Sequence, residues 1–143
     1  MGKEKITKKL EQLEKALKTL HLAMVKHGKT SEAHEDYVFF RDSLIKRFEY
    51  CTDMFWKTIR EFIAECHGIE LPVSSKKVIQ QALDVYLINE DQYEQLLASV
   101  NDRNMTAHAY QEDVAAQIAD HVAGYYQLMS QLLQKMKQEL QIF

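Results

Sequence analysis

The sequence contains few of the residues that turns, disulfides and strand-rich folds require. It has only four glycines, one proline and two cysteines in 143 residues. Strand-rich folds use many more turn residues, so this composition favours long helices. The length suits a single domain, residues 1–143, that buries a core without covalent staples. Cys51 and Cys66 would lie roughly 22 Å apart along one helix, which is too far for them to form a disulfide with each other.

A strong charge excess, a long apolar run and metal-binding spacings are also missing. The formal net charge is −3 and no block of basic residues stands alone, which argues against nucleic-acid binding through a broad basic surface. The composition does not exclude a local site that contacts one phosphate. The N-terminal stretch MGKEKITKKLEQLEK is charged throughout, and no run approaches the roughly 18 apolar residues of a membrane span. Without CxxC or HxxxH spacings, we expect no metal and no cofactor, in a cytoplasmic protein that does not enter a membrane.

Apolar residues do occur at helical spacing along most of the chain. Stripes with spacings of three and four residues predict long amphipathic helices over 6–24, about 36–65 and 114–140. The second stripe is rich in aromatic residues. Such stripes usually pack helices together, although part of this one could face a partner chain.

Two shorter helices are expected between the second and third long ones. Ser74 or Ser75 can cap a helix that contains residues 78–83, and Asn89 can cap the following stretch, EDQYEQLLASV. We therefore predict an all-α fold: an antiparallel four-helix up-and-down bundle with one or two additional short helices.

The segment DRNMTAHAY, residues 102–110, concentrates side chains that can do chemistry. Arg103 can hold a phosphate through two hydrogen bonds, His108 can give or take a proton near neutral pH, and Asn104 can orient either group. On a straight helix Arg103 and His108 would point about 140° apart. They can converge if the segment is a turn that leads into the last helix, or across two copies of the chain. Both routes place them at a helix N-terminus, where backbone N–H groups favour anions.

An arginine and a histidine are sufficient for metal-free cleavage of RNA. The histidine would assist attack of the 2′-hydroxyl on the adjacent phosphate, and the arginine would stabilise the added charge. The spacing Arg-x-x-x-x-His is nevertheless common by chance, and a histidine near a helix start is often a cap or a surface group. The segment alone leaves both interpretations open.

The wider sequence adds a more specific signal. The stretch RDSLIKRFEYCTDMFWKTIREFI, residues 41–63, followed by the Arg-Asn-x-x-x-His-x-Tyr block, resembles the nucleotidyltransferase substrate-binding protein family, a branch of the HEPN superfamily. The likeness covers nearly the whole chain. It implies a HEPN helical bundle that forms a homodimer, with a minimal nucleotidyltransferase encoded nearby as its partner.

The resemblance also implies roles for individual residues. In HEPN ribonucleases, the arginine–histidine motifs of two subunits meet at the dimer interface, which on this chain points to Arg103 and His108 as catalytic, with Asn104 as the usual polar residue after the arginine. In toxins of a neighbouring branch, the tyrosine two residues after the histidine receives AMP from the partner. Here that residue is Tyr110, which could instead only pack at the helix start. Departures from the family pattern are Cys51, Asp53 and the pair Gln80-Gln81.

Two functions of different classes fit these features. The chain could be a metal-independent ribonuclease toxin, acting on RNA and regulated by the nucleotidyltransferase, or a non-catalytic substrate- or nucleotide-binding subunit of that enzyme. Nucleotidyl transfer requires a Gly-Ser segment followed by paired aspartates, and this chain contains no Gly-Ser, so that chemistry belongs to another polypeptide. The presence of the complete Arg, Asn, His and Tyr set favours the ribonuclease.

Overall fold

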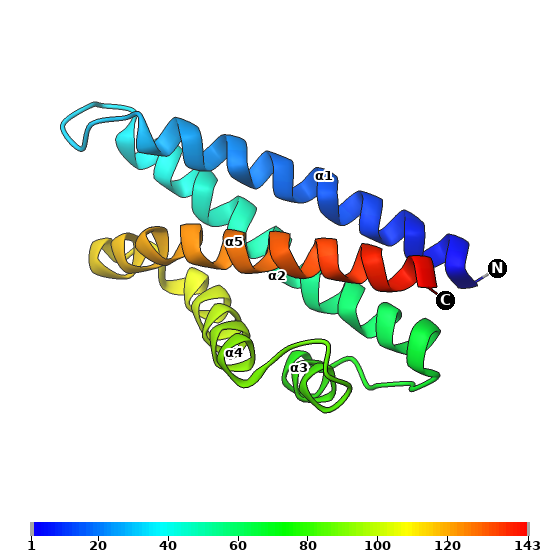
Figure 1. Cartoon of the computed structure of the whole chain (residues 1–143). Coiled ribbons are helices and arrows are strands. Elements are labelled where there is room, and N and C mark those ends of the chain that lie inside the picture. The colour runs from blue at the N-terminus through cyan, green and yellow to red at the C-terminus, as the bar shows by residue number, and fades with distance from the viewer. Residues whose placement is uncertain (1, 143) are drawn as a thin grey trace.

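The computed structural model describes residues 2–142, and within them it contains helices and turns but no strand (Figure 1). This confirms the predicted all-α bundle with additional short helices. No helix within these residues has both the length and the apolar character needed to cross a membrane. The elements are α1 (Gly2–Gly28), α2 (Tyr37–His67), α3 (Ser75–Asp84), α4 (Glu90–Met105), the 3-10 helix η1 (Thr106–His108) and α5 (Glu112–Ile142).

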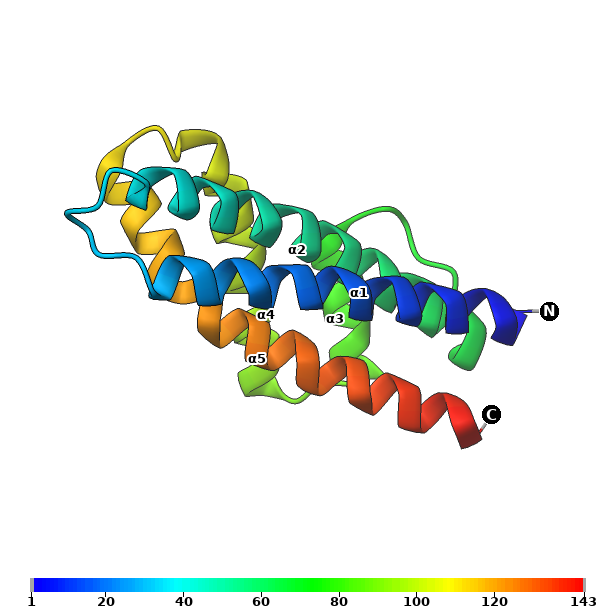
Figure 2. The same cartoon turned by 90° about the horizontal axis from the view of Figure 1, so that it is seen from above.

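The three long helices α1, α2 and α5 lie side by side, and each contacts the other two (Figures 1 and 2). Helix α1 begins, and α5 ends, at the same end of the bundle. Helix α4 packs against α2 and α5, while α3 packs against α2 and α4. The start of α2 and the turn between α4 and α5 therefore meet at the opposite end.

Apolar stripes of all the helices fill the core. Phe48, Phe55 and Phe62 of α2 are at most 2% exposed, which confirms that most of the aromatic stripe packs inside the bundle. Cys51 and Cys66 both lie on α2 and are free, as their spacing predicts. Burial raises the pKa of the Cys51 thiol to about 12, so this cysteine is an inert core residue.

The two short helices begin at the predicted caps. The Ser74 side chain accepts a hydrogen bond from the backbone N–H of Lys77 at the start of α3. Asn89 and Gln92 form a capping box at the start of α4: each side chain accepts from the other residue's backbone N–H, at 2.8 and 2.9 Å. These bonds satisfy amide groups that a helix start otherwise leaves without partners.

A buried arginine near the start of α2 bonds to the first turn of α5. Arg41 is 3% exposed, and its guanidinium donates two hydrogen bonds to the carboxylate of Glu112, one of them at 2.9 Å between Nη2 and Oε2. The ring of Tyr37 lies 5.8 Å from the guanidinium carbon. The bond lowers the pKa of Glu112, and a buried guanidinium needs such a partner. The pair therefore fixes where α5 begins.

Replacement of Glu112 by glutamine should lower the melting temperature at neutral pH, because Arg41 then stays buried without its counter-charge. The folded-state pKa of Glu112 is lowered, so its contribution is present above the ordinary carboxyl range and is lost as the pH falls. The difference between wild type and Glu112→Gln should therefore shrink between roughly pH 5 and 3. Circular-dichroism melts across this range measure it. Asp113→Asn, from the same exposed turn, is the matched control and should behave like wild type. A constant difference at every pH would contradict the ion-pair explanation.

Candidate functional site

The four predicted site residues lie at the junction of α4, η1 and α5. Arg103 and Asn104 belong to the last turn of α4, His108 ends η1, and Tyr110 lies in the turn before α5. The predicted placement at a helix N-terminus is wrong for Arg103, because α4 continues past residue 100 and ends at Met105. The Thr106 hydroxyl donates to the backbone carbonyl of Arg103 at 2.7 Å, which closes the end of the helix.

The guanidinium of Arg103 is bound by two carboxylates of α2. Its Nε and Nη2 donate to the two oxygens of Asp53 at 2.7 and 2.9 Å, and Nη2 lies 3.3 Å from Oε1 of Glu49. The hydrogen bond that Arg103 donates to Asp53 is the main reason why the pKa of Arg103 is raised. Neither carboxylate is among the site residues predicted from the sequence. Two acidic residues four apart on a predicted helix were the available signal, since they share one face and favour a cation opposite them.

His108 is exposed and does not meet Arg103 within one chain. In the part of the chain that the structure describes, no hydrogen bond or ion pair joins the two residues. Asn104 is also exposed. The ring centroids of His108 and Tyr110 lie 6.3 Å apart, with an interplanar angle of 55°. Because η1 and a turn separate Arg103 from Tyr110, their seven-residue spacing does not place them on one helical face.

Tyr110 stands at the edge of a small hollow between α2 and η1. Its side chain is 80% exposed, and its hydroxyl accepts a hydrogen bond from Nε2 of Gln111 at 3.3 Å. The hollow has a volume of about 330 Å³ and is lined by Asp42, Ile45, Lys46, Glu49, Thr106, Ala109 and Tyr110. Glu49 thus contacts both Arg103 and this hollow, and the phenol is open to a large reagent such as a second protein.

A second network holds the end of α4 from the side of α5. One carboxylate oxygen of Asp102, Oδ2, accepts a hydrogen bond from the Tyr125 hydroxyl and lies 2.7 Å from both that oxygen and Nδ1 of His121. Burial and the adjacent carboxylate raise the pKa of Tyr125. This network was not predicted from the sequence, because Asp102 lies 19 and 23 residues before its partners. Neighbouring residues 102 and 103 therefore anchor α4 to α5 and α2, respectively.

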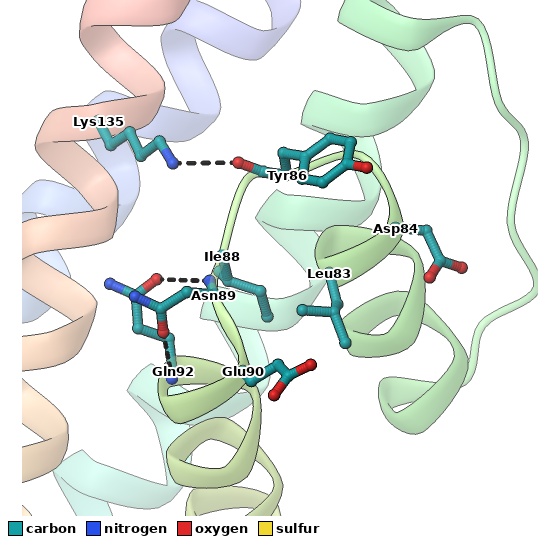
Figure 3. A pocket seen from close by; sticks show the side chains of 8 residues that line it. All are labelled: Leu83, Asp84, Tyr86, Ile88, Asn89, Glu90, Gln92 and Lys135. Atoms are coloured by element: carbon teal, nitrogen blue, oxygen red, sulfur yellow. Dashed lines mark hydrogen bonds between the residues drawn. The ribbon is translucent and has the colours of Figure 1, made fainter.

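A further hollow of about 660 Å³ lies at the other end of α4 (Figure 3), lined by Leu83, Asp84, Tyr86, Ile88, Asn89, Glu90, Gln92 and Lys135. Its polar groups hold the turn between α3 and α4. Lys135 Nζ donates to the carbonyls of Tyr86 and Leu87 at 3.2 and 2.7 Å, next to the left-handed φ of 63° at Tyr86. The Asn89–Gln92 capping box forms another part of the wall. These groups are already engaged in structure, which favours the α4–η1–α5 junction as the functional site.

Within residues 2–142, no group of three or more His, Cys, Asp or Glu side chains is placed to hold a metal ion. The groups with chemical capacity at the junction are the imidazole of His108, the guanidinium of Arg103 and the phenol of Tyr110. Together they can transfer a proton, bind a phosphate and accept a covalent modification.

Solved structures share this arrangement of helices. A protein from Thermus thermophilus is 33% identical, with a TM-score of 0.76, and the match covers 87% of this chain and 98% of that one. A tri-AMPylated HEPN toxin from Shewanella oneidensis, solved in complex with an MNT antitoxin, is 20% identical with a TM-score of 0.72 (92% and 96% covered). A toxin–antitoxin structure with AMP-PNP is 15% identical with a TM-score of 0.65 (92% and 96% covered). The latter two show similarity of fold.

The sequence itself identifies the family. No curated protein matches the chain. The model of the family described as "Nucleotidyltransferase substrate binding protein like" matches residues 8–138, which include all five α-helices in whole or in large part and the complete junction. The chain belongs to the nucleotidyltransferase substrate-binding-protein-like family.

Proposed function

We propose that this chain is the HEPN-type subunit of a two-gene module and acts as a metal-independent ribonuclease regulated by a minimal nucleotidyltransferase. Family membership and the fold shared with the Shewanella toxin, which was solved with its MNT antitoxin, support the partner. The observation that carries the proposal is the junction itself. Arg103, Asn104, His108 and Tyr110 all belong to the α4–η1–α5 junction at one end of the bundle, and three of the four residues are exposed.

The proposed reaction is transfer of a phosphodiester onto the neighbouring ribose hydroxyl. His108 takes the proton of the 2′-hydroxyl, whose oxygen forms a bond to phosphorus while the bond to the 5′-oxygen of the next nucleotide breaks. Arg103 stabilises the extra negative charge on the phosphoryl oxygens. The leaving 5′-oxygen takes a proton from solvent water, and His108 later returns its proton to solvent. The products are a 2′,3′-cyclic phosphate and a 5′-hydroxyl.

A homodimer would complete this site. Arg103 and His108 of one chain do not bond to each other. In a homodimer, the Arg103 and His108 pairs of the two copies would lie close together and form one site. Large apolar side chains are exposed around the same end of the bundle, at the start of α2 and at the junction: Val38 (50%), Phe39 (72%), Met105 (42%) and Tyr110 (80%). Burial of these side chains against a second copy would remove them from water and would bring the two motifs together.

Tyr110 is the proposed acceptor of AMP from the partner enzyme. Its phenolic oxygen would attack the α-phosphorus of ATP, pyrophosphate would leave, and the phenolic proton would pass to a base on the nucleotidyltransferase. The exposed hydroxyl and the adjacent hollow favour access by that enzyme. AMP attached there would place a negative charge and a bulky group beside His108 and would block RNA from reaching the imidazole.

The alternative is a non-catalytic subunit that binds the substrate or nucleotide of the nucleotidyltransferase. One observation favours it: the guanidinium of Arg103 is already bound by Asp53 and Glu49. Cleavage of RNA by the purified protein separates this function from the ribonuclease.

Light scattering of the purified chain at micromolar concentration should give twice the monomer mass of 16.8 kDa. Phe39→Asp should shift the protein toward monomer, because it places a charge in the proposed apolar interface. Val73→Asp is the control, since Val73 is 69% exposed but lies before α3, away from that end. A monomeric wild type across this concentration range would remove the paired site.

The purified protein should cleave single-stranded RNA in the presence of EDTA and leave 2′,3′-cyclic phosphate ends. His108→Ala and Arg103→Ala should each reduce the rate by about 10² or more, because proton transfer or charge stabilisation is lost. Both variants should keep the fold and the dimer. His67→Ala, an exposed histidine at the far end of α2, should cleave like wild type. If wild type is inactive, or if His108→Ala cleaves equally well, the binding function becomes the better conclusion.

Co-expression with the adjacent nucleotidyltransferase should add the mass of one or more AMP units to the intact chain. Tyr110→Phe should abolish the addition because it lacks the attacking oxygen, whereas Tyr86→Phe, 86% exposed at the other end of α4, should not. Intact-mass spectrometry measures the addition. An unchanged mass in the presence of an active partner and ATP would leave Tyr110 with a structural or RNA-stacking role.

A further inference from the structure

The hydrogen-bonding capacity of Arg103 is only partly free for a ligand. A guanidinium can bind a phosphate with two hydrogen bonds, donated either from its Nε–Nη2 edge or from its Nη1–Nη2 edge. Asp53 occupies the first edge, with bonds of 2.7 and 2.9 Å. Glu49 lies 3.3 Å from Nη2, the nitrogen that both edges share. Within residues 2–142, Nη1 makes no hydrogen bond, so a phosphate has one free nitrogen to approach.

Carboxylates also compete with a phosphate for this guanidinium. Arg103 faces both Glu49 and Asp53, while the other oxygen of Glu49 lies 3.6 Å from Nζ of Lys46, whose side chain is 78% exposed. Arg103, Glu49 and Asp53 are each partly shielded, with side-chain exposures of 27%, 25% and 35%, so solvent screens them incompletely. An RNA phosphate must therefore either accept a one-point contact or displace a carboxylate.

The two carboxylates are held differently. Asp53 makes a planar two-point bond, which defines the orientation of the guanidinium. Glu49 makes one longer contact with Arg103, pairs through its other oxygen with the exposed Lys46 at 3.6 Å, and lines the hollow next to Tyr110. Glu49 is therefore the carboxylate that an incoming anion displaces more easily, and its departure frees the Nη1–Nη2 edge.

We propose that Asp53 is a positioning residue that orients Arg103 for the reaction, and that Glu49 competes with the RNA phosphate for the same guanidinium. The inference rests on the proposed ribonuclease site. It assigns opposite effects to two neighbouring acidic residues of α2: loss of Asp53 impairs the chemical step, whereas loss of Glu49 strengthens binding.

Two nearly isosteric variants test the inference with two readouts. The binding probe is a fluorescein-labelled oligonucleotide with 2′-O-methyl groups, which lacks the attacking hydroxyl, and fluorescence anisotropy gives its Kd at low salt. Glu49→Gln should bind about twofold to fivefold more tightly than wild type, the range expected from one partly exposed ion pair. Asp53→Asn should bind no more weakly than wild type, yet its kcat on cleavable RNA should fall about tenfold or more.

Matched variants separate these roles from general effects of charge and folding. Glu65→Gln removes the same charge from an exposed position on α2, sixteen residues and roughly 24 Å from Glu49, and should leave the Kd unchanged. Asp53→Glu keeps a carboxylate and should recover part of the lost kcat. Circular-dichroism melts establish that each variant is folded.

The orientation of Arg103 can also be measured without catalysis. In wild type, the Arg103 Nε–H group should give a slowly exchanging NMR signal because it is bonded to Asp53, and this protection should be lost in Asp53→Asn but kept in Glu49→Gln. If wild type cleaves no RNA, the ribonuclease proposal fails, while anisotropy and NMR still test the ion-pair cluster. The inference is overturned if Glu49→Gln binds no tighter than Glu65→Gln, if an active Asp53→Asn keeps full kcat, or if its Nε–H protection is unchanged.

Discussion

Helix α2 contacts every other helix of the bundle, and its burial along most of its length constrains where those helices can lie. Its buried stripe is mostly apolar and packs against α1, α3 and α5. The strip that carries Glu49 and Asp53 is different, because two carboxylates facing another helix require a cation. Arg103 supplies it from the last turn of α4. The packing of α2 thus determines both the core and the position of the candidate site.

The two arginines that bind carboxylates at this end of the bundle differ in exposure and in spare capacity. Arg41 is almost completely buried and bonds to the carboxylate at the start of α5, an arrangement suited to holding helices together. Arg103 is partly exposed and faces two carboxylates, and its Nη1 makes no hydrogen bond within residues 2–142. With Asp102 anchored on α5, the junction is held on several sides while His108 and Tyr110 remain exposed. A rigid support with exposed reactive groups is what a positioned active site requires.

The two ends of α4 show why the fold alone does not identify the function. At its start, the polar groups of the larger hollow satisfy backbone groups: Lys135 bonds to carbonyls, and Asn89 caps the helix. At its end, His108 and Tyr110 are exposed, and the partly exposed Arg103 is bound to the carboxylates of Asp53 and Glu49. A fold shared with toxins does not show which residues of this chain are functional, because function depends on the side chains at a site.

The sequence by itself determined the helices and their caps. Spacings of three and four predict the three long helices, and Asn89 begins α4 because its side chain can satisfy an amide two or three residues away. These are local effects, whose partners lie within a few residues. The same local reasoning failed at Arg103, which it placed at a helix start, because nothing near the arginine shows that α4 continues to Met105. Only the tertiary structure decided that Arg103 meets Asp53, 50 residues earlier, and that Asp102 meets His121 and Tyr125. Such pairs depend on which helix faces pack together when the whole core is buried. Residue spacing along the chain does not show which faces these are.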